Sequence, residues 1–99
     1  MHTHIVFFWL AEPDNQDHRE ALKAGVHQLM QDPMVRRSTI GKPAQTLRDV
    51  VESGYDVGFI AEFDGLEAHD VYQNGVHHQK FLEDCKTLWS TVQVYDVET

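Results

Sequence analysis

The sequence contains little cysteine, little positive charge and no long apolar run. Cys85 is the only cysteine among 99 residues, so the chain forms no internal disulfide, which suits a reducing compartment. Eight Lys and Arg residues against 16 Asp and Glu give a formal net charge of -8. This argues against nucleic acid or an anionic membrane as a partner, because phosphate binding requires clustered positive charge. The apolar run over residues 5–11 is too short to span a bilayer and lacks the flanks of a signal peptide, so we expect a cytoplasmic protein.

What the chain does contain is typical of one small globular domain. Apolar residues make up 41% and charged residues 24%, while only six glycines and three prolines occur, so disorder is not expected. No repeat, linker or low-complexity segment divides the chain. We therefore expect residues 1–99 to form a single domain with a modest core.

Changes in hydrophobic periodicity predict alternating strands and helices. Strands are expected over residues 2–10, 34–42, 54–63 and 88–97, and helices over residues 16–31, 65–74 and 76–86. With the last two helical segments taken as one unit, the order is βαββαβ. This order predicts an α+β, ferredoxin-like fold in which helices cover one face of an antiparallel four-stranded sheet. In the last strand, strict alternation places Trp89 on the face opposite Val92 and Val94.

The first strand carries apolar side chains on both of its faces. One face is expected to hold His4, Val6, Phe8 and Leu10, and the other Ile5, Phe7 and Trp9. Helices cover only one face of such a sheet, so the second row would leave a large apolar patch in water. The pattern therefore predicts a homodimer that packs sheet against sheet.

Two adjacent histidines begin the last predicted helix, and they cannot share one environment because neighbours on a helix point about 100° apart. His78 shares its stripe with Phe81, Leu82 and Cys85, whereas His77 shares a polar stripe with Lys80 and Asp84. His78 is therefore expected to face the sheet and His77 the solvent. Cys85 lies two turns from His78, too far for a thiolate pair, and is interpreted as a small buried apolar residue.

At these positions the sequence resembles the stress-responsive α/β-barrel (Dabb) domain family over essentially its whole length. The resemblance is carried by His4 in HIVFFWL, GYDV at residues 54–57, Tyr72 with His78 and Phe81, and VQVYDV at residues 92–97. Gly75 and Val76 stand where the family usually has a His-Pro pair. The resemblance implies a ferredoxin-like monomer and a homodimer whose sheets join into a central barrel.

The resemblance also implies candidate site residues. One branch of the family cyclises linear polyketides with a pocket tyrosine and histidine that match Tyr72 and His78, and His4 matches a further pocket histidine. Val57 stands where that branch has another histidine. The expected ligand pocket therefore includes His4, Val57, Phe59 and Phe81, with Tyr72 and His78 as catalytic candidates. The aromatic residues are equally explained as plain core or dimer contacts.

Three functions remain open at this point. The leading one is a small stress-responsive protein with an apolar cavity, no assigned chemistry and, at most, a small apolar or aromatic ligand. The second is a cofactor-free, polyketide-cyclase-like enzyme in which His78 acts as general base and Tyr72 donates a hydrogen bond to the enolate. The third is a cofactor-independent monooxygenase of the related dimeric group. In the first function His78 is a half-buried ring with a structural role.

A metal site is not expected from the sequence. His2 and His4 lie two residues apart on one face of a strand, but no third ligand follows at a diagnostic spacing. His69, beside Asp70, is interpreted as covering a helix surface. No cofactor is expected either.

Overall fold

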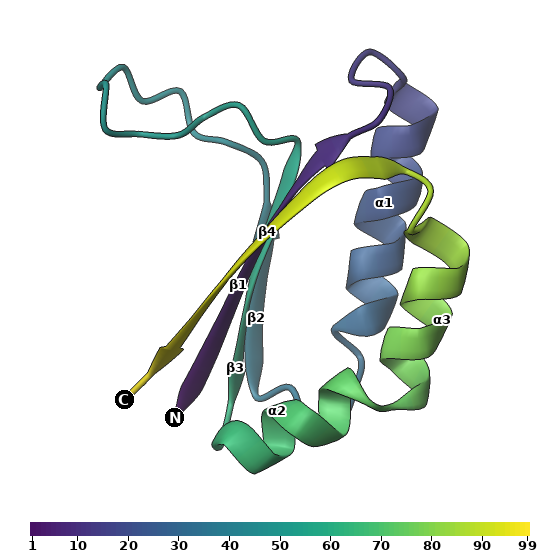
Figure 1. Ribbon diagram of the computed structural model, residues 1–99, viewed down its shortest axis with the longest axis vertical. Helices are drawn as coiled ribbons and strands as arrows, with labels where there is room; N and C mark the ends of the chain where they lie inside the picture. The colour runs from purple at the N-terminus through teal and green to yellow at the C-terminus, as the bar shows by residue number, and fades with distance from the viewer.

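Four strands form one antiparallel sheet, and every helix lies on the same side of it (Figure 1). The computed structural model describes residues 1–99. Its elements in chain order are β1 (His2–Leu10), α1 (Gln16–Leu29), β2 (Arg37–Gly41), β3 (Val57–Phe63), α2 (Leu66–Gln73), α3 (Val76–Cys85) and β4 (Trp89–Glu98). The predicted ferredoxin-like α+β fold is confirmed. None of the helices has the length and apolar character needed to cross a membrane.

The strands lie in the order β2-β3-β1-β4, so β1 is central and β4 is an edge strand. On one side β1 pairs with β3, where His4 lies opposite Ala61. On the other side it pairs with β4, where His4 lies opposite Asp96 and Val6 opposite Val94. This register brings side chains from the two ends of the chain onto one patch of the helix-covered face.

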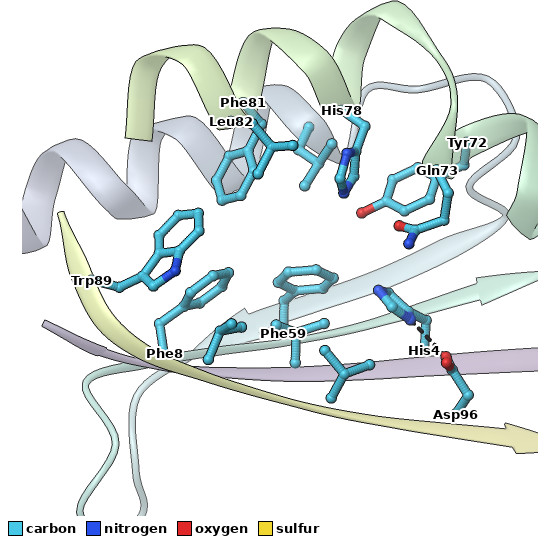
Figure 2. Close-up of a pocket in the computed structure, with 14 residues that line it drawn as sticks. His4, Phe8, Phe59, Tyr72, Gln73, His78, Phe81, Leu82, Trp89 and Asp96 are labelled. Atoms are coloured by element: carbon cyan, nitrogen blue, oxygen red, sulfur yellow. Dashed lines mark hydrogen bonds and ion pairs between the residues drawn. The ribbon is translucent and has the colours of Figure 1, made fainter. Parts of the chain in front are cut away.

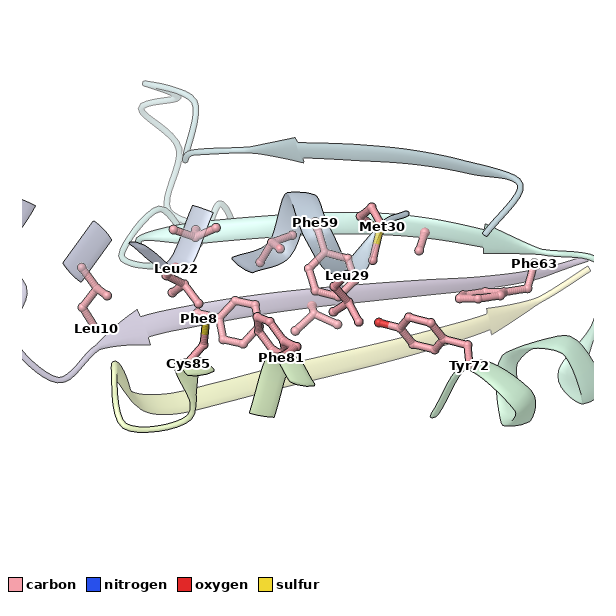
Figure 3. Close-up of a cluster of buried hydrophobic side chains, with 14 residues drawn as sticks. Phe8, Leu10, Leu22, Leu29, Met30, Phe59, Phe63, Tyr72, Phe81 and Cys85 are labelled. Atoms are coloured by element: carbon pink, nitrogen blue, oxygen red, sulfur yellow. The ribbon is translucent and has the colours of Figure 1, made fainter. Parts of the chain in front are cut away.

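Alternation along β1 is as predicted. Its even-numbered side chains, from His2 to Leu10, are buried under the helices, and its odd-numbered ones are half-buried on the open face. Figure 3 shows the sheet residues of this core facing those of the helices. Leu22, Val26 and Leu29 form the buried stripe of α1. Asn15 caps the N-terminus of this helix, because its side chain accepts a hydrogen bond from the His18 N–H at 3.0 Å.

Two strands are shorter than predicted, and side chains explain both. The strand expected from residue 34 begins only at Arg37, because the Asp32 carboxylate accepts the Met34 N–H at 2.9 Å and holds a turn there. The strand expected from residue 54 begins at Val57. Just before it, the Asp56 carboxylate accepts the Leu10 N–H at 2.8 Å in place of a backbone carbonyl.

The predicted face of Trp89 is wrong. Leu10 pairs with Trp89 but Trp9 pairs with Thr91, so a register irregularity at Ser90 adds one residue to β4. This extra residue turns Trp89 toward the helices, where its ring stacks on Phe81 with centroids 5.5 Å apart. Strict alternation fails at a bulge, and the bulge places an indole ring on the same face as Val92.

Candidate functional site

A cavity of about 220 Å³ lies between the sheet and helix α3. Its wall consists mainly of apolar side chains: Val6, Phe8, Leu29, Phe59, Phe81 and Trp89. Polar groups gather at one end, namely His4, Tyr72, Gln73, His78 and Asp96, as Figure 2 shows. Leu82, Val92 and Val94 complete the lining, and each is at least one-third exposed, so the cavity opens to solvent past the edge strand, whereas the Tyr72 oxygen at the polar end is buried from water.

Helix α3 positions His78 and Phe81 on the cavity wall, one turn apart. His78 is half-buried, and burial lowers the pKa of its imidazole, with the nearby His4 lowering it further. A neutral imidazole at neutral pH is able to accept a proton. His77 instead lies 3.5 Å from the Asp32 carboxylate with 38% of its side chain exposed. The two adjacent histidines therefore occupy different environments, as predicted.

Tyr72 is fully buried at the end of helix α2 and supplies the other half of the polar end. Its ring packs against Phe63, with centroids 4.9 Å apart, and edge-to-face against His78 at 5.5 Å. Its hydroxyl points into the cavity and has no hydrogen-bond partner (Figure 2). Burial, assisted by the charge of Asp32, raises the pKa of this phenol, so it remains a proton donor at every physiological pH.

Asp96 extends the polar end with a cluster of histidines. Its Oδ1 lies 2.6 Å from Nδ1 of His4 and 3.0 Å from Nε2 of His2. Nε2 of His69 lies 3.2 Å from Nδ1 of His4. Burial raises the pKa of Asp96, but its hydrogen bonds with His4 and His2 outweigh this, so the carboxyl pKa lies below its usual value. This carboxylate is therefore ionised at neutral pH.

The structure brings most of the predicted site residues together. His4, Phe59, Tyr72, His78 and Phe81 all line the cavity. Val57 does not: it is only 1% exposed and lies in the core, at the end of β3 that pairs with Phe8. It therefore has no place in the cavity wall.

His69 and Asp96 were missed by the sequence analysis. The interpretation of His69 as a surface residue is wrong, because it is 6% exposed and its ring stacks on His2 with centroids 4.2 Å apart. Alternation along β4 would have placed Asp96 on the same face as Val94 and Val92. The direction of His69 had no such signal, because it depends on how α2 lies on the sheet.

These features define a small α+β protein in which a half-open apolar cavity with one polar end lies between an antiparallel sheet and a helix. The chain belongs to the stress-responsive A/B barrel domain (Dabb) family, whose sequence model matches residues 3–99. No curated protein matches the chain in sequence.

Solved structures confirm the fold. An Arabidopsis thaliana protein superimposes with a TM-score of 0.82 at 19% identity, over 100% of this chain and 95% of that one. A dimeric ferredoxin-like protein of unknown function from Thermobifida fusca has a TM-score of 0.78 at 18% identity, and the match covers 99% of this chain and 90% of that one. A hydroxynitrile lyase from Passiflora edulis has a TM-score of 0.76 at 16% identity, and the match covers 97% of this chain and 90% of that one.

Proposed function

We propose that the cavity binds a small, mostly apolar molecule that carries an acceptor oxygen, and that Tyr72 donates a hydrogen bond to this oxygen. The observation that carries the proposal is the buried hydroxyl of Tyr72, which faces the cavity without a partner. An unsatisfied buried donor costs roughly 1–3 kcal/mol. A carbonyl or hydroxyl oxygen of a bound molecule would remove this cost, whereas the aromatic wall would bury the rest of that molecule.

The volume of the cavity limits the size of this ligand. An apolar cavity of about 150 Å³ is able to hold benzene, and drug-sized ligands occupy pockets of roughly 300–1,000 Å³. At about 220 Å³, the cavity suits one ring with one or two substituents. Aromatic ketones and phenols of this size combine the required apolar surface with an acceptor oxygen.

Proton transfer on such a ligand is the second candidate, and the lowered pKa of His78 favours it. A neutral His78 would take a proton from the carbon next to the carbonyl, and Tyr72 would donate a hydrogen bond to the enolate oxygen. This is the cofactor-free chemistry that the resemblance to the polyketide-cyclising branch implies. One protein with this fold is named a hydroxynitrile lyase, but at 16% identity the likeness extends to the fold alone.

The two tryptophans provide a direct test of binding. Trp89 lines the cavity, whereas Trp9 packs against Tyr55 on the open face of the sheet. Acetophenone, a one-ring ketone, is therefore expected to shift the indole ¹H–¹⁵N resonance of Trp89 and to leave that of Trp9 in place. Equal shifts at both indoles, or no shift at millimolar ligand, would overturn the proposed binding site.

The proton-transfer candidate has its own readout. With acetyl-containing ligands in D₂O, the wild-type protein is expected to accelerate exchange of the hydrogens next to the carbonyl, and His78→Gln to abolish this acceleration. His77→Gln is the matched control, because His77 neighbours His78 but pairs with Asp32 outside the cavity. Exchange at the same rate in both variants would exclude His78 as the base and leave the binding proposal untouched.

We also propose that the chain forms a homodimer through the open face of its sheet. Ile60, Tyr95 and Val97 are 41%, 56% and 47% exposed there, beside the half-buried Ile5 and Phe7. The loop between β2 and β3 projects to this side of the sheet and carries Leu47 and Val50 in exposed positions (Figure 1). A patch of this kind marks an interface in a small protein, and the Thermobifida fusca protein is dimeric.

A further inference from the structure

We propose that His2, His4, His69 and Asp96 form a binding site for one divalent transition-metal ion of the zinc type. These four side chains come from β1, α2 and β4, and one potential ligand atom from each lies within 4.8 Å of all the others. The inference goes beyond the proposed function and does not depend on it, because neither Tyr72 nor His78 belongs to the cluster.

The distances within the cluster match those between the ligands of a bound ion. Zinc bonds of about 2.0–2.2 Å place neighbouring atoms of a tetrahedral site roughly 3.3 Å apart. The His2–Asp96 and His4–His69 contacts measure 3.0 and 3.2 Å, the His4–Asp96 contact 2.6 Å and the His69–Asp96 contact 3.9 Å. All four ligand atoms lie within 4.8 Å of one another, so shifts of the order of one ångström would produce the coordination geometry.

Hydrogen bonds satisfy this arrangement only in part. If Nδ1 of His4 is protonated, its one hydrogen is donated to Asp96 at 2.6 Å, and Nε2 of His69, 3.2 Å away, either shares that hydrogen or is left without a partner. If it is not protonated, its lone pair faces the Asp96 carboxylate at 2.6 Å without a hydrogen between them. A metal cation between His4, His69 and Asp96 would accept a lone pair from each of them. It would therefore satisfy all three groups, which one shared hydrogen does only in part.

The surroundings also fit a resident ion. The three imidazoles are 7%, 6% and 8% exposed, so their directions are fixed by packing, and the 42% exposed side chain of Asp96 provides a route from solvent. The other ring nitrogen of His69 is buried without a hydrogen-bond partner, 3.7 Å from the Asp70 carboxylate. Metal-bound histidines commonly direct their second nitrogen at such a carboxylate, which orients the ring.

The chemistry of the donor set selects the metal. Imidazole nitrogens with one carboxylate suit zinc, cobalt, nickel and copper, whereas magnesium and calcium require mainly oxygen ligands. The ion would lie at the polar end of the cavity, since His4 and Asp96 also line it. The sequence pairs only His2 with His4, and the folded chain adds the other two ligands from positions far along it.

Titration of the untagged protein with Co²⁺, whose visible absorption reports coordination geometry, tests the site. We expect one Co²⁺ per chain with the intense bands of a four-coordinate site, displaced by an equivalent of Zn²⁺ and not by Mg²⁺. His69→Gln and Asp96→Asn should each weaken binding by roughly tenfold or more. His77→Gln is the matched control, because this half-exposed histidine lies outside the cluster and should leave the titration unchanged.

Circular dichroism of each metal-free variant establishes that it is folded. If a cluster variant unfolds, the Co²⁺ spectrum of the wild-type protein still tests the site. Four-coordinate Co²⁺ in the cluster would absorb intensely, whereas octahedral Co²⁺ on surface histidines absorbs only weakly. The proposal is overturned if the intense bands do not develop, if folded His69→Gln and Asp96→Asn proteins bind as tightly as wild type, or if His77→Gln weakens binding as much as they do.

Discussion

The ring of Tyr72 meets the ring of His78 edge-to-face at a centroid distance of 5.5 Å, and both side chains face one cavity. The two residues belong to successive helices, α2 and α3, that are separated by a short turn at Gly75. A permanent hydrogen-bond donor and a neutral base therefore lie side by side at the polar end of an apolar space. This pairing is the basis of the account of binding and proton transfer.

Tyr72→Phe is expected to raise the free energy of unfolding by about 1 kcal/mol, because the substitution removes a buried hydroxyl that has no partner and keeps the ring. Urea denaturation of both proteins measures the change. Tyr95→Phe, at an exposed position, is the control and should be neutral. Destabilisation by Tyr72→Phe would mean that the hydroxyl already has a hydrogen-bond partner in the folded protein.

Stability should decrease as the pH falls from 7 to 5. Burial lowers the folded-state pKa of His78, and that of His69, below the unfolded value near 6.5, so the unfolded chain binds protons first. The stability that these two histidines contribute is fully present above their pKa in the unfolded chain, and it is lost as the pH falls through their lower pKa in the folded protein. NMR titration of the ring resonances should show His78 protonating below pH 6.5, and His78→Gln should reduce the pH slope of the unfolding free energy. A His78 pKa above 6.5 would contradict this account.

Asp56→Asn should lower the free energy of unfolding by about 1–3 kcal/mol, since the Asp56 carboxylate holds two partners. It accepts the Leu10 N–H at 2.8 Å and pairs with Arg19 at 2.6 Å, and so ties α1 to the end of β1. Asp64→Asn is a matched control: its pair with Arg36 is equally short but exposed, and its loss should change stability little. Equal effects of the two substitutions in thermal unfolding would refute a special role for Asp56.

Ile60→Glu should convert a dimer into a monomer, because it places a charge at the centre of the open sheet face, opposite Ile5. Light scattering coupled to size exclusion measures the mass at micromolar concentrations. Val71→Glu places the same charge on an exposed helix position and should leave the dimer intact. A wild-type protein that is monomeric at these concentrations would exclude the proposed interface.

Local patterns were sufficient to predict the element order and the inward faces of β1 and α3, whereas the expected pocket residues came from the family resemblance. Alternation identified both faces of β1, and helical spacing directed His78 and Phe81 inward, because both signals lie within one element. The orientation of Trp89 was not predictable, since one extra residue at Ser90 reverses the alternation. A bulge of this kind depends on pairing with a strand distant in sequence.

The histidine cluster shows the same limit. Asp96 contacts His4 only because β4 pairs with β1 in one register. His69 contacts His4 and Asp96 only because α2 crosses the end of the sheet, as Figure 1 shows. Neither relationship is encoded in a local spacing. The positions of these residues follow from the packing of the complete chain, and the sequence alone leaves His2 and His4 as an isolated pair.

The most direct measurement of the central proposal compares the affinities of acetophenone and isopropylbenzene, two ligands of similar shape of which only the ketone accepts a hydrogen bond. The wild-type protein should bind the ketone roughly two- to tenfold more tightly, the value of one neutral hydrogen bond, and Tyr72→Phe should bind both equally. Equal affinities in the wild-type protein, or a preference that persists in Tyr72→Phe, would contradict the role assigned to the Tyr72 hydroxyl.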